Sequence, residues 1–267
     1  MSDTSTADLI RIIEKNAVDG CVAWKVWPAL TLIDEPGLLW TLTDIPFPVF
    51  NAVLSARFSP DSAKRRIESV LSRAREKDVP VAWFVGPESR PSDLGEHLIA
   101  SGFLPEGSST GMAAELECLD LNSAGPEGLS IEEVLDLETF QSWCDVMIPV
   151  YEFPDFVSDH WLELHASMGF GRNKSWRHFL ARMKGEPVAV SSLFLGENAA
   201  SVANVATVPA ARGRGIGTAV TTRALRTACE SGYRLATLCA SEMGESLYRR
   251  IGMKIYCCFR LYLWGGE

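Results

Sequence analysis

The chain has 267 residues, of which 47% are hydrophobic and 22% charged, and its formal net charge at pH 7 is −9. This length fits one large domain or two of ordinary size. The chain has no basic surplus to replace phosphate counterions, no apolar run near the roughly 20 residues of a membrane span, and no basic-then-apolar leader at its N-terminus. We therefore expect no nucleic-acid or membrane partner. The seven cysteines form no C-x-x-C pair, which favours reduced, buried thiols in a cytoplasmic protein.

Periodicity and turn residues predict alternating helices and strands in the first part of the chain. In chain order we expect an amphipathic helix within 1–16, strands at 21–26, 38–42 and 49–56, a helix at 60–77, a strand at 81–85, a helix at 92–100, and an extended segment from Phe103 to about Leu121.

A small, polar segment at 122–128 is the best linker candidate, and a second pattern follows it. We expect a strand at 129–134, helices at 137–150 and 159–168, strands at 178–183, 188–195 and 201–208, a helix at 216–231, a strand at 235–239, a helix at 244–251, and a last strand at 253–264. Aligned on Gly102 and Gly252, both parts run helix, strand, helix, glycine. This repeat predicts two copies of one fold, at 1–121 and 129–267.

A glycine-rich stretch in the second copy carries the clearest chemical signal. The strand before it ends at Pro209, and Gly213, Gly215 and Gly217 then alternate with arginine and isoleucine before a helix. Backbone without side chains lets several N–H groups converge on a phosphate, and the helix dipole favours the anion. The spacing G-x-G-x-G is one residue short of the dinucleotide fingerprint, and no Gly-Lys-Ser/Thr ending is present. The first copy has Arg-Phe-Ser-Pro-Asp at 57–61 in this place, so we expect it to lack the anion site.

Two motifs together resemble the GNAT superfamily of N-acetyltransferases. Residues 212–217, Arg-Gly-Arg-Gly-Ile-Gly, match its R/Q-x-x-G-x-G/A signature, and residues 239–253 resemble its second signature, with Tyr248 at the tyrosine position. The resemblance implies an α/β (α+β) fold in two GNAT-like copies, each a mixed, mostly antiparallel sheet flanked by helices. In the second copy a splayed pair of strands would admit the pantetheine arm of acetyl-CoA. The first copy would be degenerate, without a cofactor loop.

The resemblance also implies roles for particular residues. Tyr248 would be the catalytic residue that protonates the departing thiolate, and a backbone N–H of the splayed strand would polarise the acetyl carbonyl. The implied cofactor-binding residues are Val205, Ala206, Thr207, Val208, Arg212, Gly213, Arg214, Gly215, Ile216, Gly217, Thr218 and Ser241. For the acceptor we expect Tyr151, Glu152 and Asp155, because carboxylates interleaved with aromatic rings suit a cation.

The general base is left open by the sequence. Many relatives place a carboxylate where Ala203 and Asn204 stand here, and neither residue is a base. Other candidates lie in the segment that lines the acceptor site in the family: Glu152, Asp155, Asp159, His160 and His165.

Our hypothesis is an acetyl-CoA-dependent N-acetyltransferase that transfers the acetyl group directly to the amine of a small, cationic or neutral molecule. Direct transfer is favoured over a cysteine-acyl intermediate because Cys229 and Cys239 lie in buried-looking positions. A peptide or protein amine is an alternative acceptor, and a non-catalytic CoA-binding sensor or scaffold is the alternative function. We expect no metal, since the histidines and cysteines show no ligand spacing. A homodimer stays open.

Overall fold

The computed structural model describes residues 4–123 and 125–265, which fold into two compact units. Unit 1 contains the described residues up to Gly111 together with those from Tyr256 onward, and unit 2 contains Met112–Ile255. The boundaries thus fall inside two strands, whereas the sequence prediction placed one boundary at the linker 122–128, of which position 124 lies outside the described residues.

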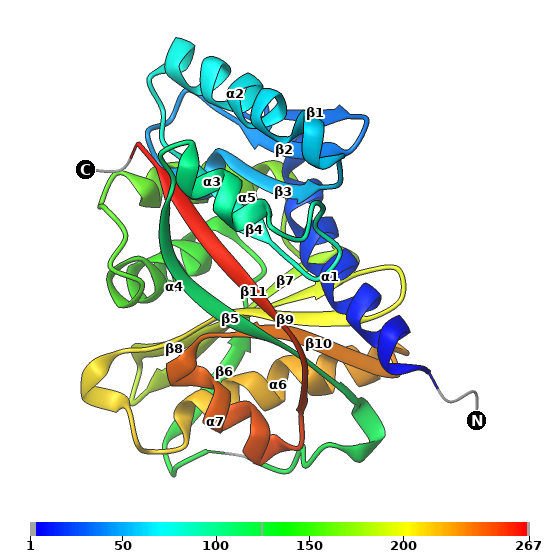
Figure 1. Ribbon diagram of the computed structural model, residues 1–267. Helices are drawn as coiled ribbons and strands as arrows, with labels where there is room; N and C mark the ends of the chain where they lie inside the picture. The colour runs from blue at the N-terminus through cyan, green and yellow to red at the C-terminus, as the bar shows by residue number, and fades with distance from the viewer. Residues whose placement is uncertain (1–3, 124, 266–267) are drawn as a thin grey trace. The chain divides into compact units, whose positions relative to one another are not determined.

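Unit 1 is a sheet with helices on both faces (Figure 1). Its elements are helices α1 (Thr6–Val22), α2 (Pro60–Lys77) and α3 (Leu94–Ala100), the 3₁₀ turns Ala23–Val26 and Pro48–Phe50, and strands β1 (Thr31–Glu35), β2 (Leu38–Leu42), β3 (Ala52–Ala56), β4 (Val81–Val85), most of β5 (Leu104–Glu115) and most of β11 (Lys254–Trp264). The strand order β1-β2-β3-β4-β11 is antiparallel except for the parallel pair β3–β4. Alternation assigns the two faces: Val53 packs with α2, and its neighbours Ala52 and Leu54 pack with α1.

Unit 2 contains the glycine stretch. Its elements are strands β6 (Leu129–Glu133), β7 (Trp176–Met183), β8 (Glu186–Leu195), β9 (Ala200–Thr207) and β10 (Leu235–Ala240), helices α4 (Leu137–Val150), α5 (Val157–Met168), α6 (Ile216–Glu230) and α7 (Glu242–Ile251), and the 3₁₀ turns Leu116–Cys118 and Pro209–Ala211. The order β6-β7-β8-β9-β10 is antiparallel up to β9, and β10 joins β9 in parallel.

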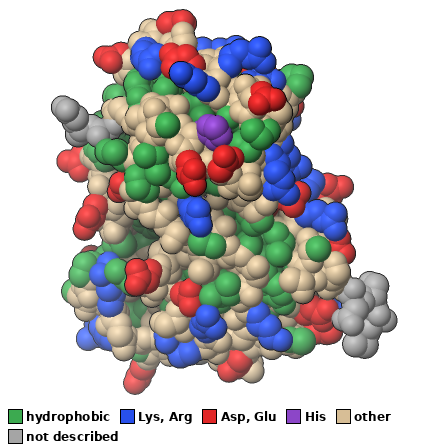
Figure 2. Space-filling view, in the orientation of Figure 1, with side chains coloured by type: hydrophobic (Ala, Val, Ile, Leu, Met, Phe, Trp, Pro, Cys, Tyr) green, Lys and Arg blue, Asp and Glu red, His purple; other side chains and the backbone are tan. Residues whose placement is uncertain are grey.

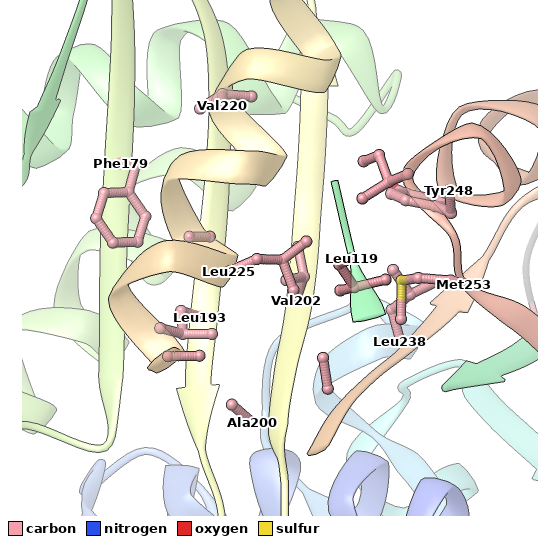
Figure 3. Close-up of a cluster of buried hydrophobic side chains, with 14 of the residues drawn as sticks. Leu119, Phe179, Leu193, Ala200, Val202, Val220, Leu225, Leu238, Tyr248 and Met253 are labelled. Atoms are coloured by element: carbon pink, nitrogen blue, oxygen red, sulfur yellow. The ribbon is translucent and has the colours of Figure 1, made fainter. Parts of the chain in front are cut away.

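The two faces of the unit 2 sheet have different chemistry. On one face, α6 packs on an apolar core, and Figure 3 shows Leu225 of this helix beside Val202 of β9. On the opposite face, which α4 covers, the strands carry polar side chains. His178 of β7 is one of them, and it lies against Phe140 and Trp143 of α4. The polar positions of this face are therefore enclosed by aromatic rings.

The predicted mixed α/β class with mostly antiparallel sheets is confirmed, and the helix at 60–77, the strand at 81–85 and the helix at 137–150 have the predicted bounds. The strand predicted at 21–26 is wrong. Those residues end α1 and form a 3₁₀ turn, because the apolar run containing Cys21 and Val22 is one face of a helix that packs on β3 and β4. The prediction also missed β1, whose pattern is broken by the acidic pair before Pro36.

The surface charges are mixed in sign, and the helices of the described residues are not membrane spans. On the face drawn in Figure 2, acidic and basic side chains are interspersed, so the excess negative charge is not gathered there. Across the described residues, every helix is too short or too polar to cross a membrane.

Candidate functional site

The glycine stretch forms a left-handed loop between β9 and α6. Gly213 has φ +73° and Gly215 has φ +77°, a region that side chains rarely adopt. A Cβ atom at either position would meet nothing within 4 Å, so the conformation and not crowding requires glycine there. Gly217 is glycine for another reason: its Cβ would lie 3.2 Å from Leu247 Cδ1 and 3.3 Å from Thr207 Oγ1.

The loop leaves the N-terminus of α6 uncapped by any side chain. Gly215 is the N-cap residue, and it has no side chain to accept from the first N–H groups of the helix. Ile216 is 1% exposed and its side chain lies in the core, so only its backbone N–H is left to contact a ligand at the loop. Arg212 and Arg214 are exposed, and Arg212 Nε donates to Thr207 O at 3.1 Å. The first turn of α6 therefore has no side-chain cap, and two exposed arginines belong to the loop just before it, an arrangement that suits an anion.

Strands β9 and β10 separate in front of this loop. Their parallel pairing consists of Ala200 with Ala236 and Ser201 with Thr237, at the start of β9. From Val202 on, β9 keeps its pairing with β8, and the chain after β10 turns into α7 at Ser241, whose Oγ accepts from Gly244 N at 3.3 Å. Of the predicted cofactor residues, Val205, Ala206 and Thr207 thus lie on the separated half of β9, and Val208 directly follows it. Ser241, another predicted cofactor ligand, caps α7.

A β-bulge lies in the middle of the separated half. Ser192 pairs with Ala203 and Val190 with Ala206, so Ser191 opposes both Asn204 and Val205. Asn204 has φ +51°, a conformation that asparagine tolerates better than most residues. A bulge of this kind redirects backbone groups out of the ladder, which is what an N–H must do to reach a ligand beside the strand.

Tyr248 is buried on α7 and packs over Gly244 of the same helix. It is 8% exposed, and a Cβ at Gly244 would lie 3.0 Å from its ring. Burial raises the pKa of Tyr248, and the nearby Tyr151 phenol raises it further. Burial also raises the pKa of Tyr151 to about 12. Tyr151 is 41% exposed as a whole, and its phenol lies in the neighbourhood of Tyr248.

The predicted acceptor residues lie between α4 and α5, and one of them, Tyr151, lies near Tyr248. Tyr151 caps the end of α4, Glu152 follows with φ +56°, and both Glu152 and Asp155 are exposed. Of the other base candidates, Asp159 is exposed and His160 lies 3.8 Å from Glu163. His165 is different, because it is 1% exposed and burial holds its pKa well below the ordinary value.

A buried polar network on the α4 side of the sheet was not predicted from the sequence. His178 Nδ1 lies 2.8 Å from Ser192 Oγ, and Asn204 Nδ2 donates to the same Oγ at 3.3 Å. The ring of His165 lies 4.5 Å from that of His178, centroid to centroid. The spacing of these residues along the chain does not predict the network, because it joins three strands and depends on their register.

Comparison with known proteins identifies this architecture. Residues 197–256 match the family model described as Acetyltransferase (GNAT) domain. The chain carries a GNAT acetyltransferase domain. The matched segment includes β9, the glycine loop, β10 and α7, so it contains the three loop glycines and Tyr248. The prediction of a GNAT-type acetyltransferase is confirmed.

Solved structures extend the likeness in fold to the whole chain. A GCN5-related N-acetyltransferase from Kribbella flavida has 20% identity and a TM-score of 0.74, with 94% of this chain and 96% of that chain covered. A tandem GNAT protein from the clavulanic acid biosynthesis pathway has 17% identity and a TM-score of 0.62, with 100% and 96% covered. A GCN5-related N-acetyltransferase from Sphaerobacter thermophilus has 17% identity and a TM-score of 0.62, with 97% and 93% covered. A comparison with curated proteins gave no significant match.

Two expectations about thiols and metals need comment beside the GNAT domain. Cys229 and Cys239 are exposed, so the expectation that both are buried is wrong. Cys229 lies at the end of α6, and Cys239 is the outward-facing position of β10, where alternation overrides an apolar composition. Among the described residues, Glu115, Glu117 and Cys118 come close enough to share an ion, but all three are exposed surface groups.

Proposed function

We propose that unit 2 is an acetyl-CoA-dependent N-acetyltransferase that transfers the acetyl group directly to the amine of a small molecule. The observation that carries the proposal is the uncapped N-terminus of α6, opened by two left-handed glycines at the end of a separated strand, with a buried tyrosine on the next helix. The loop N–H groups and Arg212 and Arg214 would hold the pyrophosphate of the cofactor.

The acetyl group would lie beside the bulge of β9. An N–H group of Val205–Thr207 that points away from β8 would donate to the thioester carbonyl and stabilise the negative charge that develops on its oxygen, whereas the Val208 N–H is already bonded to Val188 O at 2.9 Å. Amine attack forms the C–N bond, and the C–S bond breaks to release the CoA thiolate. The nitrogen then loses a proton to solvent, the thiolate takes one from Tyr248, and Tyr248 recovers its proton from solvent.

The raised pKa of Tyr248 keeps its phenol protonated at neutral pH, which argues against the base role and leaves the hydroxyl a donor to the leaving thiolate. A phenol whose pKa lies above 10 is protonated throughout the neutral range, so it always has a proton to share with the leaving thiolate. The same shift prevents it from accepting a proton from an ammonium group. Since β9 carries Asn204 in place of a carboxylate, we propose that the acceptor reacts from its neutral fraction.

Unit 1 is proposed to bind no cofactor. In the place of the loop, α2 begins with Pro60, which has no N–H, and with Asp61, which repels an anion. The gap after the short β3–β4 pairing is closed by backbone: Arg90 N donates to Ala56 O at 2.8 Å, and Phe58 N donates to Arg90 O at 3.3 Å. These contacts support a degenerate first copy.

Aromatic and acidic groups support a small cationic or neutral acceptor. Tyr151 and Phe156 are 41% and 42% exposed, and the exposed Glu152 and Asp155 lie between them in sequence. Ring faces and carboxylates together favour an ammonium group before it deprotonates. The seven cysteines form no disulfide in the part of the chain that the structure describes, which supports a cytoplasmic location.

Release of free CoA in the presence of a panel of small amines tests the proposal. We expect turnover with at least one amine and a loss of about 100-fold in kcat for Tyr248→Phe, with affinity for CoA unchanged. Tyr233→Phe is the matched control, because the Tyr233 hydroxyl donates to Gly196 O at 2.7 Å and not to a cofactor position. Binding of acetyl-CoA without turnover on any small amine or peptide would instead indicate a CoA sensor, and turnover with peptides alone would identify a peptide acceptor.

A further inference from the structure

The bulge of β9 rests on a buried chain of hydrogen bonds. Ser192 is 0% exposed, and its Oγ is contacted by Asn204 Nδ2 at 3.3 Å and His178 Nδ1 at 2.8 Å. A hydroxyl has one proton to donate. Its oxygen can also accept two hydrogen bonds, so Ser192 links the Asn204 amide and the His178 ring whichever of Ser192 Oγ and His178 Nδ1 carries the shared proton.

The histidine at the end of this chain has a fixed protonation state. His178 is 2% exposed and surrounded by rings, which lie 4.8 Å from it at Phe140, 5.4 Å at Trp143 and 4.5 Å at His165, centroid to centroid. This apolar burial lowers the pKa of His178 to about 3. The imidazole is therefore neutral throughout the neutral pH range, and titration does not disturb its contact with Ser192 there.

Neighbouring groups hold the other side of the same strand pair. Ser191 Oγ donates to Val220 O of α6 at 3.0 Å, and Trp143 Nε1 donates to Ser191 O at 3.3 Å. Successive residues of a strand point to opposite faces, so Ser191 and Ser192 fix β8 from both sides at the point where β9 bulges. Only the Ser192 side reaches the residue with the left-handed backbone, Asn204.

We propose that His178 and Ser192 are positioning residues, which hold Asn204 in its left-handed conformation and thereby aim the N–H groups that follow it at the acetyl carbonyl. This inference rests on the proposed function of unit 2. A non-glycine residue with φ near +51° costs about 1 kcal/mol, and without an anchor the strand can relax by rotating that peptide. Rotation would turn the N–H groups away from the carbonyl while the glycine loop, several residues further on, keeps its form.

Preference for acetyl-CoA over CoA measures this positioning without any acceptor. The probes are CoA and acetyl-CoA in calorimetry, and acetyl-CoA labelled with carbon-13 at the carbonyl in infrared spectroscopy. In the wild type we expect tighter binding of acetyl-CoA than of CoA and a lowered carbonyl stretching frequency. Ser192→Ala is expected to reduce the preference about tenfold, equivalent to loss of one hydrogen bond to the carbonyl, and to return the frequency toward that of free acetyl-CoA. CoA affinity should not change.

Matched variants separate positioning from general stability. Ser191→Ala removes an equally buried hydroxyl from the same strand and should lower the melting temperature without changing the preference. His178→Asn keeps a hydrogen-bonding group near the Nδ1 position and should retain most of the preference, whereas His178→Leu should lose it. Asn204→Gly adopts the backbone without strain, so it should fold and still lose the preference because the anchor is gone.

The outcomes separate this proposal from the proposed function. If the wild type binds neither CoA nor acetyl-CoA, the proposed function fails. If the wild type prefers acetyl-CoA, but Ser192→Ala and Asn204→Gly keep that preference and the shifted carbonyl frequency, the positioning role is refuted and the proposed function stands.

Discussion

Substitution of Gly215 by alanine perturbs the anion site through the backbone alone. Gly215 is the N-cap residue of α6 at φ +77°, and an added Cβ would meet nothing within 4 Å. The methyl group therefore creates no clash, and its cost is the left-handed conformation, about 1–2 kcal/mol. Alanine also restricts the unfolded chain, which offsets about 0.4–1 kcal/mol. We expect a net loss of stability of about 1 kcal/mol.

Gly232 offers a matched control at the other end of the same helix. It follows the C-cap of α6 at φ +86°, and its Cβ would also meet nothing within 4 Å. Gly232→Ala should therefore lose the same stability as Gly215→Ala. The two variants should differ in CoA affinity, because only Gly215 directs N–H groups at the proposed pyrophosphate. If the loop of Gly215→Ala relaxes to avoid the strain, CoA binding must restore the left-handed conformation. A cost of about 1.4 kcal/mol for this step corresponds to a tenfold loss of CoA affinity.

Denaturant unfolding and calorimetric titration with CoA measure the two effects separately. We predict equal shifts in unfolding midpoint for both variants and a tenfold weaker Kd for Gly215→Ala alone. Unchanged CoA affinity in Gly215→Ala, or an equal loss in Gly232→Ala, would refute the assignment of the loop to the cofactor.

Two further predictions concern histidine and cysteine. The pKa of His178 is lowered to about 3 in the folded chain, against about 6.5 for an ordinary histidine. Between these two pH values the unfolded chain binds a proton that the folded chain does not. The contribution of neutral His178 to the free energy of unfolding is therefore fully present above about pH 6.5 and is lost as the pH falls toward about 3. His178→Asn should reduce this acid sensitivity by about 1.4 kcal/mol per pH unit in urea unfolding between pH 4 and 6, and an unchanged slope would contradict the buried neutral histidine. Since Cys239 is exposed on β10, Cys239→Ala tests direct transfer: we expect sequential kinetics and full activity, whereas a ping-pong pattern abolished by the substitution would establish an acyl-cysteine.

The glycine loop and most elements could be predicted because their causes are local. The left-handed turn needs glycine at positions 213 and 215 whatever surrounds it. The helix that follows is predicted by the periodicity of its apolar residues. The prediction failed where tertiary packing decided the outcome. The segment at 21–26 has the composition of a strand, yet packing on β3 and β4 holds it in a helical end.

Site residues divide in the same way. Tyr248 could be predicted from a motif, since the motif fixes its place on a short helix after β10. The network of His178, Ser192 and Asn204 could not, because it depends on the register of β7, β8 and β9 and on a bulge. The exposure of Cys239 likewise depends on which face of β10 is covered. Composition alone predicts neither the register between strands nor which face of a strand is covered.

The number of CoA molecules bound per chain tests the central claim most directly. In calorimetry of the full chain, the account predicts one CoA per chain, held by unit 2, and loss of that binding when Arg212, Gly215 and Gly217 are replaced together. A stoichiometry of two, or binding that survives the triple replacement, would contradict it.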